Sequence, residues 1–398
     1  MTKLIRITTV PISLDKLLGN QLSFMNQHFS VTAISADQNE LEKIAAKYGV
    51  SNYHVELTRA ITPVQDLKAL WKLYRFLKKE KPEIVHTHTP KAGLIGMMAA
   101  WMAGVPVKMH TVAGMPLLEA TGLKREVLNF TEKLTYFFAD KVYPNSFVMK
   151  EIIIKENFCA GEKLHVIGNG STNGIDLAYF KPDHLTEEER IALRRELGIS
   201  PDDFVFVFVG RLVGDKGINE LVAAFKQISK FANSQVRSNP KLLLIGPLEP
   251  ELDPLLSETL QETESNPNIV MTGFQKDVRP YLAISDALVF PSYREGFPNV
   301  VMQAGAMGLP AIVTDINGCN EIIVEGQNGT IIPPKNSEAL QAAMHKMLTD
   351  VSWRTALQQK ARPMIASRYD QQLVWDALLA EYRALLERKG ERGKGLIG

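Results

Sequence analysis

The sequence predicts an α/β protein with two doubly wound, Rossmann-like parallel sheets facing a cleft. At 398 residues the chain is too long for one ordinary core. Short apolar runs alternate with helical patterns in both halves, which implies right-handed crossovers and mostly parallel sheets. The alternation stops at the glycine-rich run 168–174 and resumes after the charged stretch 185–195. We therefore expect one domain over residues 1–178 and another over 179–369, with a C-terminal helix at about 370–388 packing back on the first.

The first half contains the signals for a complete sheet. Short apolar runs between turn signals predict strands at 4–10, 31–35, 83–88, 107–112, 141–143 and 163–167. Helical patterns predict helices at 20–28, 63–80, 92–103, 124–138 and 147–157. The longest apolar stretch, 92–107, is shorter than the ~20 residues that span a bilayer. We interpret it as a buried helix and its C-terminal turn.

The second half repeats the pattern. Strands are expected at 204–209, 242–245, 269–272, 287–290 and 311–314, with helices beginning at 218 and within the run that follows 290. In doubly wound sheets ligands collect beyond the carboxyl ends of the strands. The segments that directly follow these strands are therefore where chemistry is expected.

Composition and charge exclude several functions. A formal net charge of +1 argues against a general nucleic-acid binder. The two cysteines, Cys159 and Cys319, are far apart, which fits a reducing compartment and excludes a cysteine-built zinc site. The N-terminus has no signal-peptide pattern, so we expect a cytoplasmic protein.

Two cations follow the strand at 204–209. Arg211 and Lys216 lie on a loop that leads into a helix, where an arginine fork and a lysine point charge can neutralise a diphosphate leaving group. The alternative is a solvated loop with ordinary surface charges.

A second set of polar groups follows the strand at 287–290. Glu295 can accept hydrogen bonds from sugar hydroxyls, and the backbone amides of Asn299 and Val300 at a helix N-terminus can face a phosphate. Alternatively, Glu295 only complements the helix dipole. Gln303, about two turns further on, can contact ribose hydroxyls but supplies no charge.

These motifs resemble the donor-binding domain of the family 4 glycosyltransferases. The resemblance rests on the runs Gly210-Arg-Leu and Lys216-Gly217, Glu295-Gly-Phe-Pro-Asn299, Gly308-Leu-Pro-Ala-Ile-Val-Thr-Asp315, Gly318, Glu321 and Asn173-Gly-Ile-Asp176. It covers nearly the whole chain, but the second glutamate of the family's paired signature is here Gln303. It implies the GT-B fold, a nucleotide-sugar co-substrate that we expect to be UDP-linked, retention of anomeric configuration, and neither cofactor nor metal ion.

The same resemblance implies roles for individual residues. Arg211 and Lys216 would contact the diphosphate, Glu295 the donor sugar and Gln303 the ribose, and these first three are the expected catalytic residues. The donor site would also include Phe297, Pro298, Asn299, Val300 and, from the first half, Gly19. No nucleophile is evident.

The first half is similar to enzymes that build capsule, exopolysaccharide or O-antigen repeat units. The likeness lies in the runs 86–93 and 110–116, and it implies a glycan or polyprenyl-diphosphate-linked saccharide acceptor. His86, His88, Lys91 and His110 are the candidate acceptor-binding residues, with a satisfied structural histidine as the alternative. Many relatives have a histidine where this chain has Ala113, and His110 is the candidate replacement.

The helix at 66–81 is basic and amphipathic. Its lysines and arginine alternate with Trp71 and other apolar residues, a pattern that suits docking on anionic lipid headgroups at the inner membrane. The alternative is that the apolar face covers the sheet while the lysines lie in water. Two other functions remain open for the whole chain: a nucleotide-sugar epimerase and a non-catalytic nucleotide-sugar binder.

Overall fold

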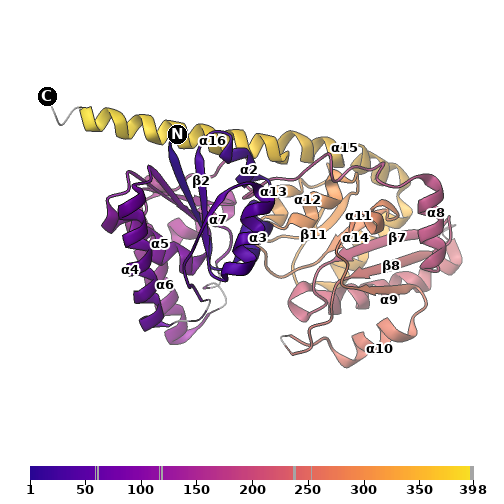
Figure 1. The fold of residues 1–398 in the computed structure, drawn as a ribbon. Coiled ribbons are helices and arrows are strands. Elements are labelled where there is room, and N and C mark those ends of the chain that lie inside the picture. Colours follow the sequence, from indigo (N-terminus) through magenta and orange to yellow (C-terminus); the bar gives the residue numbers. More distant parts are fainter. Residues whose placement is uncertain are drawn as a thin grey trace. The chain divides into compact units, whose positions relative to one another are not determined.

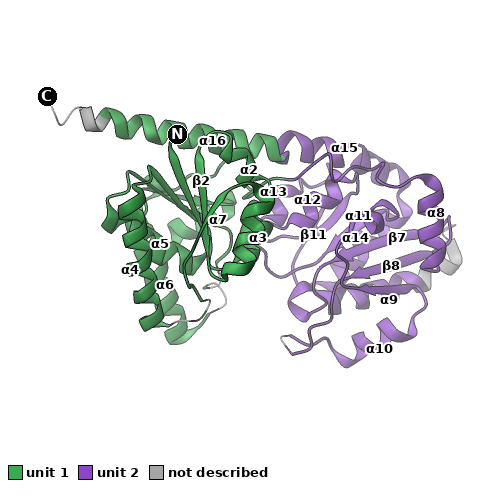
Figure 2. Ribbon diagram, in the orientation of Figure 1, with its two compact units in different colours: residues 1–174, 371–398 green, residues 175–370 purple. Residues whose placement is uncertain are grey.

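The protein divides into two compact units in the computed structural model (Figure 2). The structure describes residues 1–58, 60, 62–115, 117, 120–235, 239–251 and 253–394. Unit 1 contains residues 1–174 and the C-terminal segment from 371, and unit 2 contains residues 175–370. Pro116, the last residue of the run 110–116, lies outside the described residues.

Unit 1 is built around a six-stranded, entirely parallel sheet with the order β3-β2-β1-β4-β5-β6. Its strands are β1 (Lys3–Ile7), β2 (Ser30–Ser35), β3 (Ser51–His54), β4 (Ile84–Thr87), β5 (Val107–Val112) and β6 (Lys141–Pro144). Strand order reverses between β1 and β4, which is the topological switch point of a doubly wound sheet.

Helices cover both faces of this sheet. They are α1 (Pro11–Ser13), the π-helix η1 (Leu14–Leu18), α2 (Gln21–Asn26), α3 (Gln38–Tyr48), α4 (Pro63–Glu80), α5 (Pro90–Ala103), α6 (Gly122–Phe138), α7 (Phe147–Lys155), the 3-10 turn η3 (Gly161–Lys163) and α16 (Gln371–Lys394). Helices α4, α5 and α6 lie side by side (Figure 1) and bury Leu73, Ile95 and Tyr136 in one core. On the other face α2, α3 and α16 bury Leu22, Leu41 and other apolar side chains in a second core.

Unit 2 repeats the architecture. Its parallel sheet has the order β12-β11-β10-β7-β8-β9, with β7 (Phe204–Val209), β8 (Pro240–Ile245), β9 (Ile269–Gly273), β10 (Ala287–Phe290), β11 (Ala311–Thr314) and β12 (Gly329–Ile332). The helical elements are α8 (Glu187–Glu196), the 3-10 turn η4 (Gly214–Lys216), α9 (Ile218–Gln235), α10 (Ser257–Ser265), α11 (Arg279–Ala283), α12 (Asn299–Ala306), α13 (Cys319–Ile322), α14 (Ser337–Thr349) and α15 (Val351–Tyr369). The switch point is between β7 and β10.

Local sequence explains several of these boundaries. Alternating phenylalanine and valine make β7 a strand that is buried on both faces. A capping box between Thr186 and Glu189 begins α8, where the two residues satisfy each other's backbone amides. Pro90 occupies the first turn of α5, where a missing N–H costs nothing.

The predicted fold class is confirmed: two parallel six-stranded sheets with flanking helices. The strand predicted at 163–167 is wrong, because Lys163 ends the turn η3, Leu164 forms only an isolated bridge with Val142, and residues 165–167 have no regular secondary structure. Helix α3 and the strands β3 and β12 were not predicted. Within the described residues, no helix combines the length and the apolar character needed to cross a bilayer.

Candidate donor-binding site

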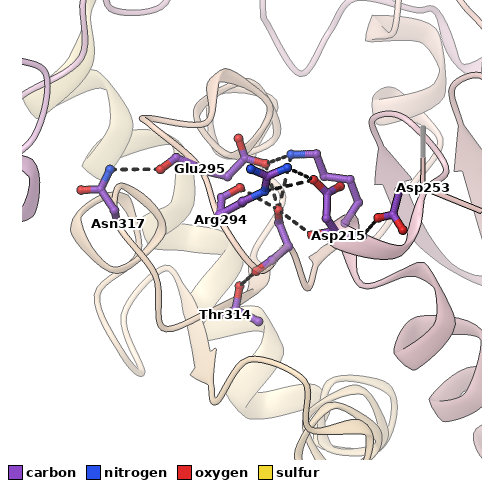
Figure 3. A network of polar contacts seen from close by, with 8 residues as sticks. Asp215, Asp253, Arg294, Glu295, Thr314 and Asn317 are labelled. Atoms are coloured by element: carbon purple, nitrogen blue, oxygen red, sulfur yellow. Dashed lines mark hydrogen bonds and ion pairs between the residues drawn. The ribbon is translucent and has the colours of Figure 1, made fainter. Parts of the chain in front are cut away.

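The predicted donor residues of unit 2 gather at its topological switch point. Strands β7 and β10 are neighbours in the sheet, so the loops that follow them, 210–217 and 291–298, leave the same edge side by side. The loop after β11, which carries Asn317, joins them (Figure 3). This is where a doubly wound sheet binds ligands.

The centre of this site is an ion pair between the first two loops. Lys216 Nζ lies 2.5 Å from Glu295 Oε1, and the two side chains are only 14% and 18% exposed. Ser292 Oγ donates to the same carboxylate oxygen at 3.0 Å. Because charges interact more strongly away from bulk water, this pair holds the lysine and the glutamate in fixed positions.

A second ion pair ties the same loops together. Arg294 donates to Asp215 Oδ2 from Nη2 at 2.7 Å and from Nε at 3.1 Å. The backbone amide of Asp215 donates in turn to Asp253 Oδ2 at 2.6 Å, on the loop after β8 (Figure 3). The lysine loop is thus anchored from two sides.

The glutamate loop is held by the loop after β11. Asn317 Nδ2 donates to the carbonyl oxygens of Glu295 at 3.1 Å and Gly296 at 2.6 Å. Thr314 Oγ1 donates to the carbonyl oxygen of Ser292. These contacts fix the backbone on both sides of the glutamate, so its carboxylate is positioned before any ligand arrives.

Two glycines permit the close approach of these loops. Gly217 has φ +70°, and a Cβ there would lie 2.2 Å from the carbonyl oxygen of Pro291. Gly318 has φ +77°, and its Cβ would lie 2.6 Å from the carbonyl oxygen of Gly296. Both the backbone conformation and the lack of space therefore require glycine.

Helix α12 contributes its N-terminus. It begins at Asn299, four residues after Glu295 in the sequence, and its N-cap residue, Pro298, has no side chain that accepts a hydrogen bond. The first amides of a helix have no intrahelical acceptor, and the dipole favours an anion there. Phe297 and Pro298 are buried, and Gln303 lies one turn along α12, partly buried.

Arg211 lies at the edge of the cluster. Its side chain is 42% exposed, and Nη1 donates to Glu249 Oε2 at 3.0 Å. This exposed pair is weak and screened by solvent, so the guanidinium can exchange its carboxylate for a phosphate at little cost. The carboxylates Asp215, Glu249, Asp253 and the amide Asn317 were not predicted, although each follows a strand end.

The thiol nearest this cluster is not a nucleophile. Cys319 is fully buried in α13. Burial, with a smaller contribution from Glu295, raises the pKa of this thiol well above its usual value. It is therefore protonated at neutral pH.

The acceptor candidates of unit 1 do not form one group. His86 and His88 lie on the face of the sheet that α16 covers, with ring centroids 4.2 Å apart. His110 is also buried, but it alternates to the opposite face, where Nδ1 is 2.8 Å from Thr87 Oγ1. Lys91 forms a 2.5 Å ion pair with Asp66.

Burial keeps these histidines neutral. It holds the pKa of His86 and of His88 well below the usual value, with nearby positive charge as a lesser cause, and it lowers the pKa of His110 to about 3. His86 is 2.6 Å from Tyr382 Oη and 2.7 Å from Thr111 Oγ1, so both ring nitrogens are satisfied within unit 1. Gly19, the remaining donor candidate, follows η1 in unit 1 with φ +50°.

Two Rossmann-like units, one of them with a polar cluster at its switch point, have the architecture of the GT-B fold. A model of group 1 glycosyl transferases matches residues 189–364, and a model of the glycosyl transferase 4-like domain matches residues 25–170. The chain is 34% identical over 387 residues to the capsular polysaccharide biosynthesis glycosyltransferase CapM of Staphylococcus aureus, covering 97% of this chain and 98% of that one. The chain belongs to the family 4 glycosyltransferases.

Two further matches agree with this assignment. The UDP-Gal:alpha-D-GlcNAc-diphosphoundecaprenol alpha-1,3-galactosyltransferase of Escherichia coli is 30% identical over 335 residues, 82% of this chain and 81% of that one. The crystal structure of Anabaena HepE in complex with UDP and glucose superposes with a TM-score of 0.79 over 96% of this chain and 100% of that one. At 18% identity this last likeness shows the fold alone.

Proposed function

We propose that this glycosyltransferase transfers a sugar from a UDP-linked donor to a glycan or polyprenyl-diphosphate-linked saccharide, with retention of anomeric configuration and without a metal ion or other cofactor. The pathway is the synthesis of a bacterial surface polysaccharide. The single observation that carries the proposal is the Lys216–Glu295 ion pair beside the N-terminus of α12. It joins a cation for the diphosphate and a carboxylate for the sugar in one fixed arrangement.

The chemistry assigns each group a role. Transfer breaks the bond between the sugar and the diphosphate, so negative charge develops on the departing oxygen. Lys216, Arg211 and the amides of Asn299 and Val300 would stabilise that charge, where transition-state stabilisation matters most. Glu295 would hold the donor sugar through its hydroxyls, and Gln303 the ribose. Charge neutralisation by side chains and a helix N-terminus is the task that a metal ion would otherwise have.

The relatives support the substrate class. The Escherichia coli relative is named for a UDP-galactose donor and a diphosphoundecaprenol-linked acceptor, and the Anabaena structure holds UDP. On this basis we propose a uridine nucleotide and a lipid-linked acceptor for this chain as well.

A lipid-linked acceptor lies in a membrane, and the outer surface of α4 has the exposed apolar side chains that could contact one. Val64, Leu67 and Trp71 are 70%, 67% and 55% exposed there, while Leu73 and Leu77 face the core. The exposed Lys68 and Lys72 lie beside this apolar surface on the same helix, a combination that suits binding to anionic lipid. We propose peripheral contact with the inner face of the cytoplasmic membrane, tested by sedimentation with anionic and zwitterionic vesicles. Trp71→Ser should reduce binding to anionic vesicles, and equal binding of both proteins would contradict this contact.

A donor screen followed by a transfer assay tests the proposed function. A nucleotide sugar that binds the native state raises the melting temperature, so thermal shift across UDP- and GDP-sugars identifies the donor. The donor is then incubated with a lipid-linked saccharide in the presence of EDTA, and NMR gives the anomeric configuration of the product. We expect transfer with retention and no loss in EDTA. Epimerised donor released without acceptor would instead indicate an epimerase, and binding without transfer or hydrolysis would indicate a non-catalytic binder.

A further inference from the structure

A cluster of buried polar side chains lies at the switch point of unit 1. Arg6 of β1 pairs in register with His86 of β4, and Thr111 of β5 pairs with Tyr143 of β6. Because side chains alternate along a strand, these residues and His88 point to the same face of the sheet, towards its carboxyl edge. Ligands of doubly wound sheets bind at this edge.

Arg6 is a buried cation without a counter-ion. It is 0% exposed, Nε donates to His88 Nε2 at 2.9 Å, and Nη2 donates to Gln21 Oε1 at 2.7 Å. Both partners are neutral, and no ion pair among the residues that the structure describes includes Arg6. Although burial lowers the pKa of Arg6, an arginine remains protonated near neutral pH. Its Nη1 is buried and has no hydrogen-bond partner among the described residues.

His88 presents a second unsatisfied donor. Its Nε2 accepts from Arg6, so in the neutral ring the proton is on Nδ1. Nδ1 is buried and has no partner either. A third buried atom, Asn145 Oδ1, is an acceptor without a partner, since the Asn145 amide nitrogen is already directed to the carbonyl oxygen of Ala113.

These atoms line one pocket. Arg6, Gln21, His88, Thr111, Asn145 and Thr172 contribute to its wall, and its volume is about 20 Å³. That volume accommodates one water-sized atom. A water can satisfy Arg6 Nη1 but leaves the charge of Arg6 unbalanced, and an unbalanced charge in a buried site is costly.

We propose that this pocket binds an anion, with one negatively charged acceptor atom beside Arg6 Nη1. A chloride ion fits the volume, and so does one oxygen of a phosphate or carboxylate. The anion has two sources: a free inorganic ion, or the charged group of the acceptor saccharide, which rests on the proposed function.

Thermal unfolding of the intact protein tests for the anion. Sodium chloride and sodium phosphate are titrated separately on the wild type and on the variants below, so that effects of ionic strength common to all of these proteins cancel. We expect either salt to raise the melting temperature of the wild type, by about 5 °C when the anion exceeds its Kd ~100-fold. Arg6→Met should abolish the rise.

Arg125→Met is the matched control. Arg125 is a half-buried arginine of the same unit, but it is paired with Glu156 at 2.9 Å, so its loss should lower stability while the anion-dependent rise persists. If Arg6→Met does not fold, wild-type crystals soaked in bromide replace it, with an anomalous peak expected beside Arg6 Nη1. No anion-dependent rise and no bromide peak would overturn the proposal in favour of a water.

Kinetics separate the two sources. Inorganic phosphate that raises the KM for the acceptor but not for the donor indicates that the acceptor's charged group enters the pocket. Binding of chloride or phosphate without such competition indicates a resident inorganic anion. If no transfer is detected at all, the proposed function fails, while the melting and bromide results still decide whether the anion site exists.

Discussion

Lys216 Nζ and Glu295 Oε1 are 2.5 Å apart although 79 positions separate the two residues in the chain. They meet because β7 and β10 are neighbours at the switch point of unit 2. Lys216, the cation that we propose contacts the diphosphate, is therefore already balanced by a carboxylate before any donor binds. Donor binding must add phosphate charge beside this pair, which the neighbouring N-terminus of α12 and Arg211 can balance.

Removing either cation should impair transfer without unfolding the protein. We expect Lys216→Ala and Arg211→Ala each to lower kcat/KM about 10-fold or more, because each removes charge that stabilises the leaving diphosphate. Initial rates with the donor identified by thermal shift provide the measurement. Lys226→Ala is the control, since Lys226 pairs with Glu262 on the surface of unit 2 and its loss should leave the rate unchanged. Near-normal turnover in both site variants would refute the diphosphate assignment.

Glu295, on the loop after β10, and Gln303, on α12, should respond differently to substitution. Glu295→Ala removes the sugar contact and leaves Lys216 without its partner, so we expect transfer to be largely lost. Gln303→Glu should be tolerated, because Gln303 is partly exposed on α12 and hydroxyl contacts need only a polar oxygen. Circular dichroism confirms the fold and initial rates give the comparison. Full activity in Glu295→Ala would mean that the motif has been misread.

Much of the fold of unit 2 could be predicted, because the composition of each segment favours the same strand or helix that the folded sheet requires. The buried strand β7 and the start of α9 at Ile218 follow from composition and glycine placement. Partnerships were not predictable, since the sequence does not show that Asp253 would bind the amide of Asp215 or that Asn317 would hold the Glu295 loop. Such contacts depend on which strand ends become neighbours.

The histidines of unit 1 also show that contacts between residues far apart in the chain could not be predicted from the sequence. His86 and His88 lie on one side of the sheet, as the period-2 alternation of side chains along a strand leads one to expect. It gave no sign that Tyr382, almost 300 positions later, would satisfy His86. The strand predicted at 163–167 failed for a related reason: apolar residues there pack against the core without a neighbouring strand to pair along their length.

Gly318 offers a test of the close approach between two loops. Gly318→Ala should weaken donor binding, because its Cβ would press on the carbonyl oxygen of Gly296 and displace the Glu295 loop. Gly326→Ala is a matched control, since Gly326 also has a positive φ, +69°, but nothing lies within 4 Å of its Cβ. Both variants should lose about 1 kcal/mol of stability from backbone strain. Only Gly318→Ala should also raise the donor Kd, measured by calorimetry, and equal Kd values would contradict the role of the close approach.

Glu132 makes the stability of unit 1 depend on pH. It lies in α6, 7% exposed, and burial raises its pKa from 4.5 to about 7. The folded state therefore keeps a proton that the unfolded chain releases, so the contribution of Glu132 to stability is highest below pH 4.5 and falls as pH rises to about 7. A shift of this size corresponds to about 3 kcal/mol, lost in full above pH 7.

Glu132→Gln should remove this decline, because an amide does not titrate. Denaturant unfolding between pH 5 and pH 8 should show the variant gaining stability relative to the wild type as pH rises. The buried histidines act in the opposite direction, since their lowered pKa values cost stability as pH falls below about 6.5. They are present in both proteins, so the difference isolates Glu132. Glu126→Gln is the control, because Glu126 lies on the exposed surface of the same helix; its free energy of unfolding should follow that of the wild type at every pH. If the free energy of Glu132→Gln also follows the wild type in this way, Glu132 is not protonated in the folded state.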